Sequence, residues 1–366
     1  MKIIDRGKTR KIRIGNVTIG GGLPVRVQSM TNTDTTDVNS TVRQIRQLED
    51  AGCEIVRVAV PDMASAGRLG QIKKRINIPL VADIHFDYRI ALEAINQGVD
   101  KLRINPGNIG ARDKVETVVN AAKKARIPIR IGVNAGSLKA VHKKTHSPVA
   151  TRAAALADAA MEHVRILESL DFRDTVISLK ASDVPTTVAA YRLIAAQRNY
   201  PLHLGITEAG TLFRGTIKSS VGLGILLNEG LGDTLRVSLT ADPVEEVKVT
   251  YQILQALGLR STGIELVSCP TCARCEVDLI KIAAELEQKL ASMHSLSSRF
   301  AQRPLKIAVM GCVVNGPGEA READLGIAGG RNTGLVFRKG KIIGRVAPAQ
   351  WVPTLAKMIK KEMGKP

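Results

Sequence analysis

Aromatic residues, acidic residues and long apolar runs are all scarce in this chain of 366 residues. Only five Phe, four Tyr and one Trp are present, which argues against a protein that stacks the bases of nucleic acid on aromatic rings. The longest apolar runs, such as 78–82 and 307–310, fall far short of the roughly 18 residues that span a bilayer. The first residues contain no apolar signal core. We therefore expect a cytoplasmic protein with no membrane association and no nucleic-acid partner.

The shortage of acidic residues leaves the chain strongly basic. Lys and Arg number 53 and Asp and Glu number 34, which gives a formal net charge of +19 at pH 7. This balance favours an anionic partner, either a phosphorylated small molecule or an acidic protein, since the scarcity of aromatics argues against nucleic acid. The apolar share of 44% and the charged share of 24% are those of ordinary globular proteins, and the length suggests two domains.

Cysteine is scarce too, but four of the five cysteines lie close together in the sequence. They are Cys269, Cys272, Cys275 and Cys312, whereas Cys53 begins an apolar strand and is expected in the core. In a cytoplasmic protein this grouping indicates a metal or catalytic site rather than disulfides. The first three have the C-x2-C-x2-C spacing typical of an iron-sulfur cluster, for which Cys312 is a remote fourth ligand. A structural zinc site and buried thiols are the alternatives.

Eight short β-branched segments run through the first two thirds of the chain, each followed by a helical pattern. They cover residues 25–29, 54–60, 80–85, 101–105, 129–134, 175–180, 202–208 and 234–240. Eight such units are what an α/β fold of the (β/α)8 TIM-barrel type requires, and a doubly wound open sheet is the alternative. A hairpin over 11–19, turning at Gly15-Asn16, is expected to plug the lower end of the barrel.

The repeat ends near residue 258, and the pattern after it is different. A Cys-rich turn precedes an amphipathic helix whose predicted apolar face contains Val277, Ile280 and Ala284. A strand over 305–310, a hairpin through 338–341 and a final helix over 350–363 follow. We predict a barrel domain over residues 1–258, including the N-terminal hairpin, and a small α/β domain over residues 259–366.

Polar residues at the carboxyl ends of the predicted strands define the candidate site, because barrel enzymes place their chemistry there. They are Arg57, Asp83, His85, Arg103, Asn105, Arg130, Asn134, Lys180, Glu208, Arg236 and Ser238. Four arginines and one lysine on one mouth favour a phosphorylated substrate, since Arg binds phosphate through paired hydrogen bonds. Glu208 is either an acid or base or an ion-pair partner of Arg236. His85 is a site residue or a core histidine, and the turn at 105–110 resembles a backbone nest for phosphate.

Four motifs resemble those of a known family. Residues 269–272 (CPTC), 310–319 (MGCVVNGPGE), 27–33 (VQSMTNT) and 82–85 (ADIH) closely resemble the 4-hydroxy-3-methylbut-2-enyl diphosphate synthases of the non-mevalonate isoprenoid pathway, in their bacterial two-domain form. The resemblance covers essentially the whole chain. It implies a TIM barrel joined to a [4Fe-4S] domain, and an oxidoreductase that opens the ring of 2-C-methyl-D-erythritol 2,4-cyclodiphosphate.

The same resemblance implies roles for individual residues. Three cysteines and a carboxylate would hold the [4Fe-4S] cluster, with Cys275 as a non-ligand neighbour; the ligands are Cys269, Cys272, Cys312 and Glu319. Glu208 and Glu319 would be catalytic. The substrate-binding residues would be Arg57, Asp83, His85, Arg103, Arg130, Asn134, Lys180, Arg236 and Ser238. Because the reduction takes two electrons and one cluster passes them singly, we expect reduced ferredoxin or flavodoxin as donor; such donors are acidic and suit a basic surface.

The route of the chain predicts how the two domains cooperate. Barrel helices run antiparallel to their strands, so the eighth helix returns the chain to the face opposite the mouth. We therefore expect the cluster domain to serve the barrel of a second subunit in a head-to-tail homodimer. Two other functions remain open: a Schiff-base aldolase that uses Lys180 on a phosphorylated substrate, and a zinc-containing nucleic-acid-binding protein.

Overall fold

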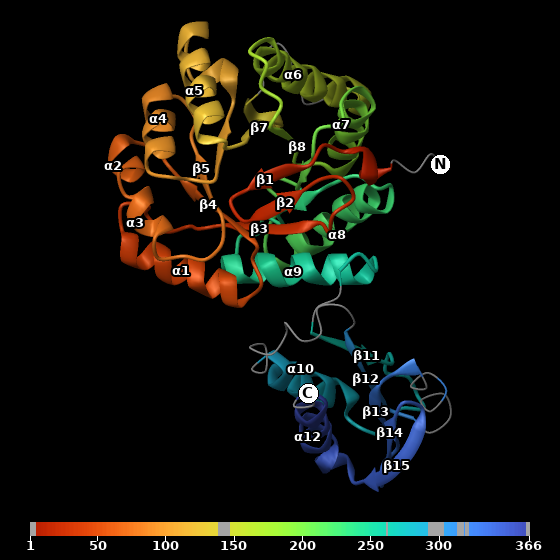
Figure 1. Cartoon of the computed structure of the whole chain (residues 1–366). Helices are drawn as coiled ribbons and strands as arrows, with labels where there is room; N and C mark the ends of the chain where they lie inside the picture. The colour runs from red at the N-terminus through yellow and green to blue at the C-terminus, as the bar shows by residue number, and fades with distance from the viewer. Residues whose placement is uncertain are drawn as a thin grey trace. The chain divides into compact units, whose positions relative to one another are not determined.

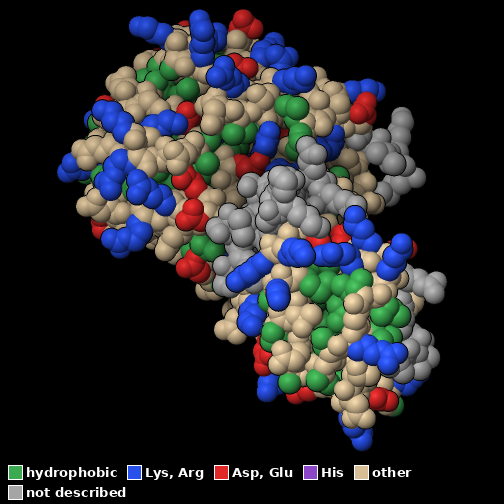
Figure 2. Space-filling view, turned by 60° about the horizontal axis from the view of Figure 1, so that its bottom comes forward, with side chains coloured by type: hydrophobic (Ala, Val, Ile, Leu, Met, Phe, Trp, Pro, Cys, Tyr) green, Lys and Arg blue, Asp and Glu red, His purple; other side chains and the backbone are tan. Residues whose placement is uncertain are grey.

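Two units make up the chain, Met1–Leu259 and Arg260–Pro366, and each has a hydrophobic core of its own. The computed structural model in Figure 1 describes residues 5–137, 147–260, 263–291, 304–312, 318 and 322–363. Within this described part, no helix combines the length and apolarity needed to cross a membrane. Figure 2 shows Lys and Arg side chains scattered over the visible surface, as the excess of basic residues requires.

Parallel strands form the barrel of the first unit. Its sheet has eight strands in the order β8-β7-β6-β5-β4-β3-β10-β9: β3 (Arg26–Met30), β4 (Ile55–Ala59), β5 (Leu80–Asp83), β6 (Lys101–Ile104), β7 (Ile129–Asn134), β8 (Thr175–Lys180), β9 (His203–Leu204) and β10 (Thr234–Leu235). A parallel bridge from Ile177 to Leu202 joins the two end strands, and Ile177 N donates to Pro201 O at 3.0 Å. The sheet therefore closes, which confirms the predicted barrel over the open sheet.

Helices surround the barrel (Figure 1). They are α1 (Val38–Asp50), α2 (Met63–Ala66), α3 (Leu69–Lys73), α4 (Tyr88–Asn96), α5 (Arg112–Ala125), α6 (Val149–Ser169), α7 (Val184–Gln197), α8 (Leu212–Asn228) and α9 (Pro243–Ala256). In α1 the positions Val42, Ile45 and Leu48, spaced three residues apart, are all buried. This spacing puts the three side chains on one face of α1, which packs in the same hydrophobic core as the strand residues.

The last two barrel strands are much shorter than predicted. The sequence pattern predicted strands over 202–208 and 234–240, whereas β9 and β10 contain two residues each. Gly205 directly follows β9, and a Cβ at this position would collide with Lys180 Nζ and lie 2.8 Å from Arg236 O. A glycine in a strand pattern often marks a place where another part of the chain approaches closely. The polar residues 208 and 238 consequently stand on loops that follow the strands.

An antiparallel hairpin closes the amino-terminal end of the barrel. Strands β1 (Ile12–Ile14) and β2 (Val17–Ile19) pair across a turn in which Gly15 has a φ of 55°, a left-handed conformation that favours glycine. The hairpin isoleucines pack on Ile55, Val81 and Val176, which lie in the first halves of their strands. The hairpin therefore occupies the end opposite the mouth, as the sequence pattern indicated.

A five-stranded mixed sheet forms the centre of the second unit, in the order β11-β12-β13-β14-β15. The elements are β11 (Ile264–Ser268), α10 (Leu279–Ala291), β12 (Leu305–Met310), β13 (Leu325–Gly329), β14 (Gly334–Arg338), β15 (Lys341–Val346) and α12 (Trp351–Met363). The predicted apolar face of α10 is wrong in two positions, because Ile280 is 71% exposed and Ala284 is exposed too, while Leu279 and Leu286 are buried. The neighbouring leucines occupy the face that contacts the sheet, which leaves Ile280 on the other side of the helix.

Candidate active site

Four cationic side chains of the barrel strands lie close enough together to affect one another's pKa. Arg57 lies in β4, Arg103 in β6, Arg130 in β7, and Lys180 is the last residue of β8. The parallel register places Arg103 beside Arg130, and Lys180 beside Asn134. Arg130, Arg103 and Lys180 are 1%, 5% and 7% exposed. The strand ladder therefore holds several predicted site residues as one buried cationic group.

Asp83, at the end of β5, is the acidic residue that this group surrounds. Its Oδ1 accepts a hydrogen bond from Arg103 Nη1 at 3.2 Å, and its Oδ2 lies 3.7 Å from Arg57 Nε. His85 Nε2 lies 3.7 Å from Asp83 Oδ1. Burial disfavours the charged carboxylate, but Arg57, the His85 contact and Arg103 together hold the pKa of Asp83 below its ordinary value. Asp83 is therefore ionised and anchors two of the arginines.

The remaining charge is not balanced within the group. Burial, and then repulsion from Arg57 and Arg103, lowers the pKa of Arg130 well below its ordinary value. Burial and repulsion from Arg130 and Arg57 act in the same way on Lys180. Within the described part of the chain, Arg130 Nε and Nη1 have no hydrogen-bond partner. Buried donors without acceptors are costly, so a bound anion would satisfy both the charge and the hydrogen bonds.

A fifth cation, Arg236, is held by a carboxylate that the sequence did not reveal. Arg236 Nε and Nη2 each donate to Glu246 in α9 at 3.0 Å, so the predicted ion-pair alternative with Glu208 is wrong. Arg236 also reaches Met30, whose Sδ lies 3.5 Å from Nη1 and 3.0 Å from Arg57 Nε. A helix that follows the last strand thus orients an arginine at the mouth through a bidentate pair.

The other predicted site residues lie on the rim or the loops. Glu208 is exposed and has a φ of 52°, which is strained for a residue with a side chain. His85 is half exposed, with its ring nitrogens 3.1–3.2 Å from Arg103 Nη1, so it is a rim residue and not a core histidine. Asn134 ends β7 and Ser238 follows β10; both are partly buried. Cys53 is 3% exposed, and burial raises its pKa to about 12, as expected for a core thiol.

The turn at 105–110, predicted as a phosphate nest, makes hydrogen bonds within the barrel. Gly107 N already donates to His163 Nδ1 at 3.1 Å. Asn105 Oδ1 accepts a hydrogen bond from Gly132 N at 3.0 Å, so this side chain braces the neighbouring strand. Intramolecular bonds therefore occupy one of the donors that a nest would need.

Two buried basic residues beneath the mouth were missed in the sequence. Lys101 and His203 are fully buried, and burial lowers the pKa of both well below ordinary values. Lys101 Nζ lies 3.4 Å from Gln28 Oε1, and His203 Nδ1 lies 2.9 Å from Thr234 Oγ1. Alternation along β6 puts Lys101 on the same face as Arg103, a signal that would have identified it.

Two thiols of the second unit, those of Cys269 and Cys275, lie beside the end of β12. Gly311 follows this strand, and its N–H donates to Cys269 Sγ at 3.5 Å. A Cβ at Gly311 would collide with Cys275 Sγ, and the next residue, Cys312, is buried. Cys272 is exposed on the intervening turn, and the cysteines form no disulfide. The turn 269–275 and the end of β12 therefore meet around a glycine that leaves room for them.

These thiols suit an iron-sulfur cluster in donor chemistry, since thiolates are its protein ligands. Backbone N–H donors to sulfur, such as Gly311 N, are one means by which proteins tune such clusters. Cys275 Sγ instead donates to Val277 O at 3.3 Å and packs on the apolar core. Among the described residues, no three His, Cys, Asp or Glu side chains gather as a single metal ion requires. The predicted ligand Glu319 lies outside the described residues.

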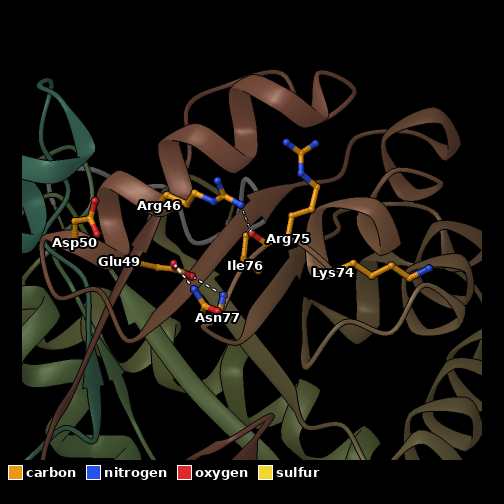
Figure 3. A pocket seen from close by; sticks show the side chains of 7 residues that line it. All are labelled: Arg46, Glu49, Asp50, Lys74, Arg75, Ile76 and Asn77. Carbon is orange, nitrogen blue, oxygen red and sulfur yellow. Dashed lines mark hydrogen bonds between the residues drawn. The ribbon is translucent and has the colours of Figure 1, made fainter.

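A separate surface hollow of the first unit is lined by none of the candidate site residues (Figure 3). It has a volume of about 530 Å³ and is lined by Arg46, Glu49, Asp50, Lys74, Arg75, Ile76 and Asn77. Its polar groups already bond to one another: Glu49 Oε1 accepts from Asn77 N at 2.6 Å, and Arg46 Nη2 donates to Arg75 O at 3.4 Å. These bonds connect the end of α1 to the segment after α3, and they give the hollow a structural role.

The fold and the two sites define a class of two-domain barrel enzyme, with a group of buried cations in one unit and a thiol site in the other. Family models agree: the GcpE TIM-barrel domain matches residues 9–251, and the GcpE protein C-terminal domain matches residues 265–361. The chain belongs to the GcpE family, which confirms the resemblance found in its motifs.

Similar proteins carry one enzyme name, 4-hydroxy-3-methylbut-2-en-1-yl diphosphate synthase (flavodoxin). The protein of Geobacillus kaustophilus is 59% identical over 98% of this chain and 94% of its own length. That of Geobacter sulfurreducens is 59% identical over 97% and 98%, and that of Clostridium perfringens is 57% identical over 98% and 99%. Among solved structures, dihydropteroate synthase from Stenotrophomonas maltophilia is similar with a TM-score of 0.52 at 14% identity, over 68% of this chain and 98% of its own. The last similarity shows the barrel fold alone.

Proposed function

We propose that this chain catalyses the two-electron reductive ring opening of 2-C-methyl-D-erythritol 2,4-cyclodiphosphate to 4-hydroxy-3-methylbut-2-enyl diphosphate, a step in isoprenoid precursor synthesis. The observation that carries the proposal is the excess of buried cations at the barrel mouth. Five cations lie there (Arg57, Arg103, Arg130, Lys180 and Arg236), and in the contacts above two carboxylates pair with three of them: Asp83 with Arg57 and Arg103, and Glu246 with Arg236. A substrate with two linked phosphates supplies the missing negative charge.

The barrel residues bind and orient this substrate. The cations, together with Asn134 and Ser238, hold the two phosphates, and the Arg130 donors that lack a partner give the anion its most deeply buried contact. Asp83 fixes Arg103 and Arg57, while His85 stands on the rim beside Arg103. Fixed cations accept developing phosphate charge without reorganising when the ring oxygen leaves. They therefore stabilise the leaving group of the reaction.

The second unit would hold a [4Fe-4S] cluster through Cys269, Cys272 and Cys312, with the carboxylate of Glu319 as fourth ligand. When bound, this cluster supplies the two electrons one at a time. The reaction breaks the bond from the tertiary carbon to the phosphate oxygen and expels the neighbouring hydroxyl as water. Glu208, exposed on its loop, gives the proton that this hydroxyl needs in order to leave.

An acidic electron donor fits the charge of the chain. The names of the relatives include flavodoxin, and a net charge of +19 attracts an acidic protein and speeds its association. We infer that reduced flavodoxin, or ferredoxin, docks twice in each turnover. We also infer that the protein works in the cytoplasm, where its thiols stay reduced.

A head-to-tail homodimer would bring the two sites together. Helix α9 ends at Ala256, and near this end Tyr251 Oη donates to Gly52 O, just before β4, at 2.7 Å. The chain therefore leaves the barrel at the amino-terminal ends of the strands, opposite the mouth. We propose that each thiol site serves the barrel of the partner. Mixing Cys269→Ala chains with Lys180→Ala chains tests this: mixed dimers should recover activity, and mixed dimers without activity would overturn it.

The whole proposal is tested by incubating anaerobic protein with the cyclodiphosphate and dithionite. We expect 4-hydroxy-3-methylbut-2-enyl diphosphate to form at a rate proportional to enzyme; intact substrate with fully loaded protein would refute the assignment. One observation favours a second candidate, because the lowered pKa of Lys180 suits a Schiff-base nucleophile. Borohydride treatment in the presence of a phosphorylated ketose or aldose separates the two, since only an aldolase becomes covalently labelled at Lys180.

A further inference from the structure

The interior of the barrel beneath the mouth contains polar side chains where such barrels are usually apolar. Gln28, Lys101, His203 and Thr234 lie on β3, β6, β9 and β10 and are at most 1% exposed. Lys101 stands two residues before Arg103 on the same strand, so the two side chains point into the same interior. Branched apolar side chains normally fill this space. These four residues form a polar layer that the substrate contacts proposed above do not use.

Few hydrogen bonds satisfy the polar layer. Lys101 Nζ lies 3.4 Å from Gln28 Oε1, and His203 Nδ1 lies 2.9 Å from Thr234 Oγ1. Within the described part of the chain, Gln28 Nε2 and His203 Nε2 have no hydrogen-bond partner, although buried polar atoms in native proteins nearly always have one. The layer therefore has spare hydrogen-bonding capacity at atoms that are shielded from bulk water.

Lys101 is surrounded mainly by positive charge. The charged or titratable groups of the barrel interior around it are Arg57, Asp83, Arg103, Arg130, Lys180, His203 and Arg236. The two carboxylates of the site are already paired, Asp83 with two arginines and Glu246 of α9 with Arg236. Among the described residues, no ion pair joins Lys101 to a carboxylate. A charged Lys101 would therefore lack a counter-ion in the ligand-free barrel.

The Lys101 amine gives up its proton more readily than the neighbouring cations do. Burial, and then repulsion from Arg130 and Arg57, lowers the pKa of Lys101 well below its ordinary value, whereas guanidinium groups stay protonated in proteins. Lys180 differs from Lys101, because Glu246 acts to raise the pKa of Lys180 and its side chain is 7% exposed. Lys101 is therefore the lysine of the barrel interior that loses its charge first when no anion is bound.

A bound anion reverses this balance. Arg130, with two donor atoms that have no partner among the described residues, is the cation that acts most strongly on Lys101, and a negative charge nearby favours the ammonium form of a lysine. We propose that Lys101 is an uncharged amine in the ligand-free barrel and takes up a proton when the anionic substrate binds at the mouth. The positive charge of the site then rises only when an anion is present to balance it. Lys101 is a positioning residue that acts through Arg130, and the inference rests on the proposed function for the identity of the ligand.

The same proton helps to hold the product. When the bond from the tertiary carbon to the phosphate oxygen breaks, the electron pair stays on that oxygen, and the neighbouring hydroxyl leaves as water with the proton from Glu208. Two electrons and one proton enter the reaction, so the open diphosphate has one more negative charge than the ring. A charged Lys101 lies within the barrel to oppose this additional charge.

Calorimetry measures the proton uptake directly. The cyclodiphosphate is titrated into anaerobic, iron-loaded protein without a reductant, in buffers with different heats of ionisation. A working pH of about 8 lies between the ordinary pKa values of His and Lys, so proton uptake there reports a lysine. Lys101→Met should take up about one proton fewer than the parent and bind the cyclodiphosphate about tenfold more weakly.

Two further variants and the parent itself sharpen the test. Lys124→Met, at an exposed lysine of α5, is the matched control, and His203→Gln should keep the proton uptake of the parent. In the parent, binding that is linked to one proton weakens as the pH rises, so the dissociation constant should increase by up to about tenfold per pH unit above about pH 8. Circular dichroism confirms that each variant is folded.

The outcomes separate this inference from the proposed function. If the parent binds the cyclodiphosphate without proton uptake and with an affinity that does not change with pH, the inference is overturned and the proposed function stands. Equal uptake by the parent and by folded Lys101→Met would assign the proton to another group and would also overturn it. If the parent does not bind the cyclodiphosphate, the proposed function fails, and this inference fails with it.

Discussion

The barrel mouth and the thiol turn are built in different ways. The barrel cations stand on strands whose backbone is fixed by a parallel ladder, and they are buried without enough acidic partners. The thiols stand on the turn 269–275 and just after β12, with Cys272 exposed. A site on strands is complete before its ligand arrives and costs stability until then, whereas a site on turns is completed by the group it binds. Substitutions in the two sites should therefore have opposite effects on the ligand-free protein.

The largest effect is expected at the thiol turn. Cys269→Ala should remove the bound iron and lower ring-opening activity by more than about 100-fold. Mutating even the groups that hydrogen-bond to a metal ligand costs about 10- to 100-fold in metal affinity or activity. Iron content of anaerobic protein and activity with dithionite measure this. Cys53→Ala, at a buried thiol of the barrel, is the control and should retain its iron. Full iron content in Cys269→Ala would remove this residue from the ligand set.

In the barrel, Lys180→Met should lower kcat/KM by about 100-fold or more, since removing one partner of a buried charge contact costs several kcal/mol. The same change should raise the stability of the ligand-free protein by about 1–2 kcal/mol, because a buried charge with too few partners is replaced by an apolar side chain. Pyrophosphate should raise the Tm of the parent and not of the variant. Arg173→Met, at a half-exposed arginine, is the control.

The stability gain of Lys180→Met should depend on pH. The folded-state pKa of Lys180 is below the unfolded value of about 10.4, so the unfolded chain binds the extra proton and stability of the parent rises with pH across that window. The difference between parent and variant should shrink as the pH approaches about 10. A difference that grows with pH would show that the lysine is stabilised, not strained, in the folded barrel.

Asp83→Asn should act in the opposite direction from Lys180→Met. It removes the carboxylate between Arg57 and Arg103, and the free energy of unfolding at pH 7 should fall by about 3 kcal/mol. The folded pKa of Asp83 is lowered, so its contribution is present above about pH 4 and is lost as the pH falls further. Urea unfolding at pH 7 and at a pH below about 4 checks this, with exposed Asp171→Asn as control. An equal loss in the free energy of unfolding at the two pH values would contradict an ionised Asp83 carboxylate.

The smallest effect concerns the loop at Glu208. Its left-handed φ of 52° costs about 1 kcal/mol or slightly more in a residue with a side chain. Glu208→Gly should therefore stabilise the protein by up to about 1 kcal/mol, whereas Glu208→Ala, which keeps the strain, should not. Thermal unfolding of the two variants distinguishes these cases. A loss of stability in the glycine variant would mean that the carboxylate contributes to the fold.

Periodicity made most of the barrel predictable. Strand runs such as 129–134 and 175–180 match β7 and β8 residue for residue, because buried parallel strands are continuous β-branched segments. Strands β9 and β10 were overestimated: each contains two residues, and β9 ends before Gly205, where no side chain fits. Ile280 was placed on the wrong face of α10 because two adjacent apolar residues, Leu279 and Ile280, satisfy the same pattern.

The site was predictable in its residue types and less so in its pairings. Strand-end cations could be found because a barrel directs its chemistry to one mouth. The partner of Arg236 could not, since Glu246 lies in a helix that begins after the strand and looks like an ordinary first-turn acid.

Iron and acid-labile sulfide in protein purified without oxygen test the central claim, which is that the second unit holds a cluster that reduces a cyclodiphosphate held in the barrel. The claim predicts about four iron and four sulfide per chain, and the loss of both in Cys269→Ala. Colourless protein with bound zinc and no sulfide, even after reconstitution with iron and sulfide, would contradict it.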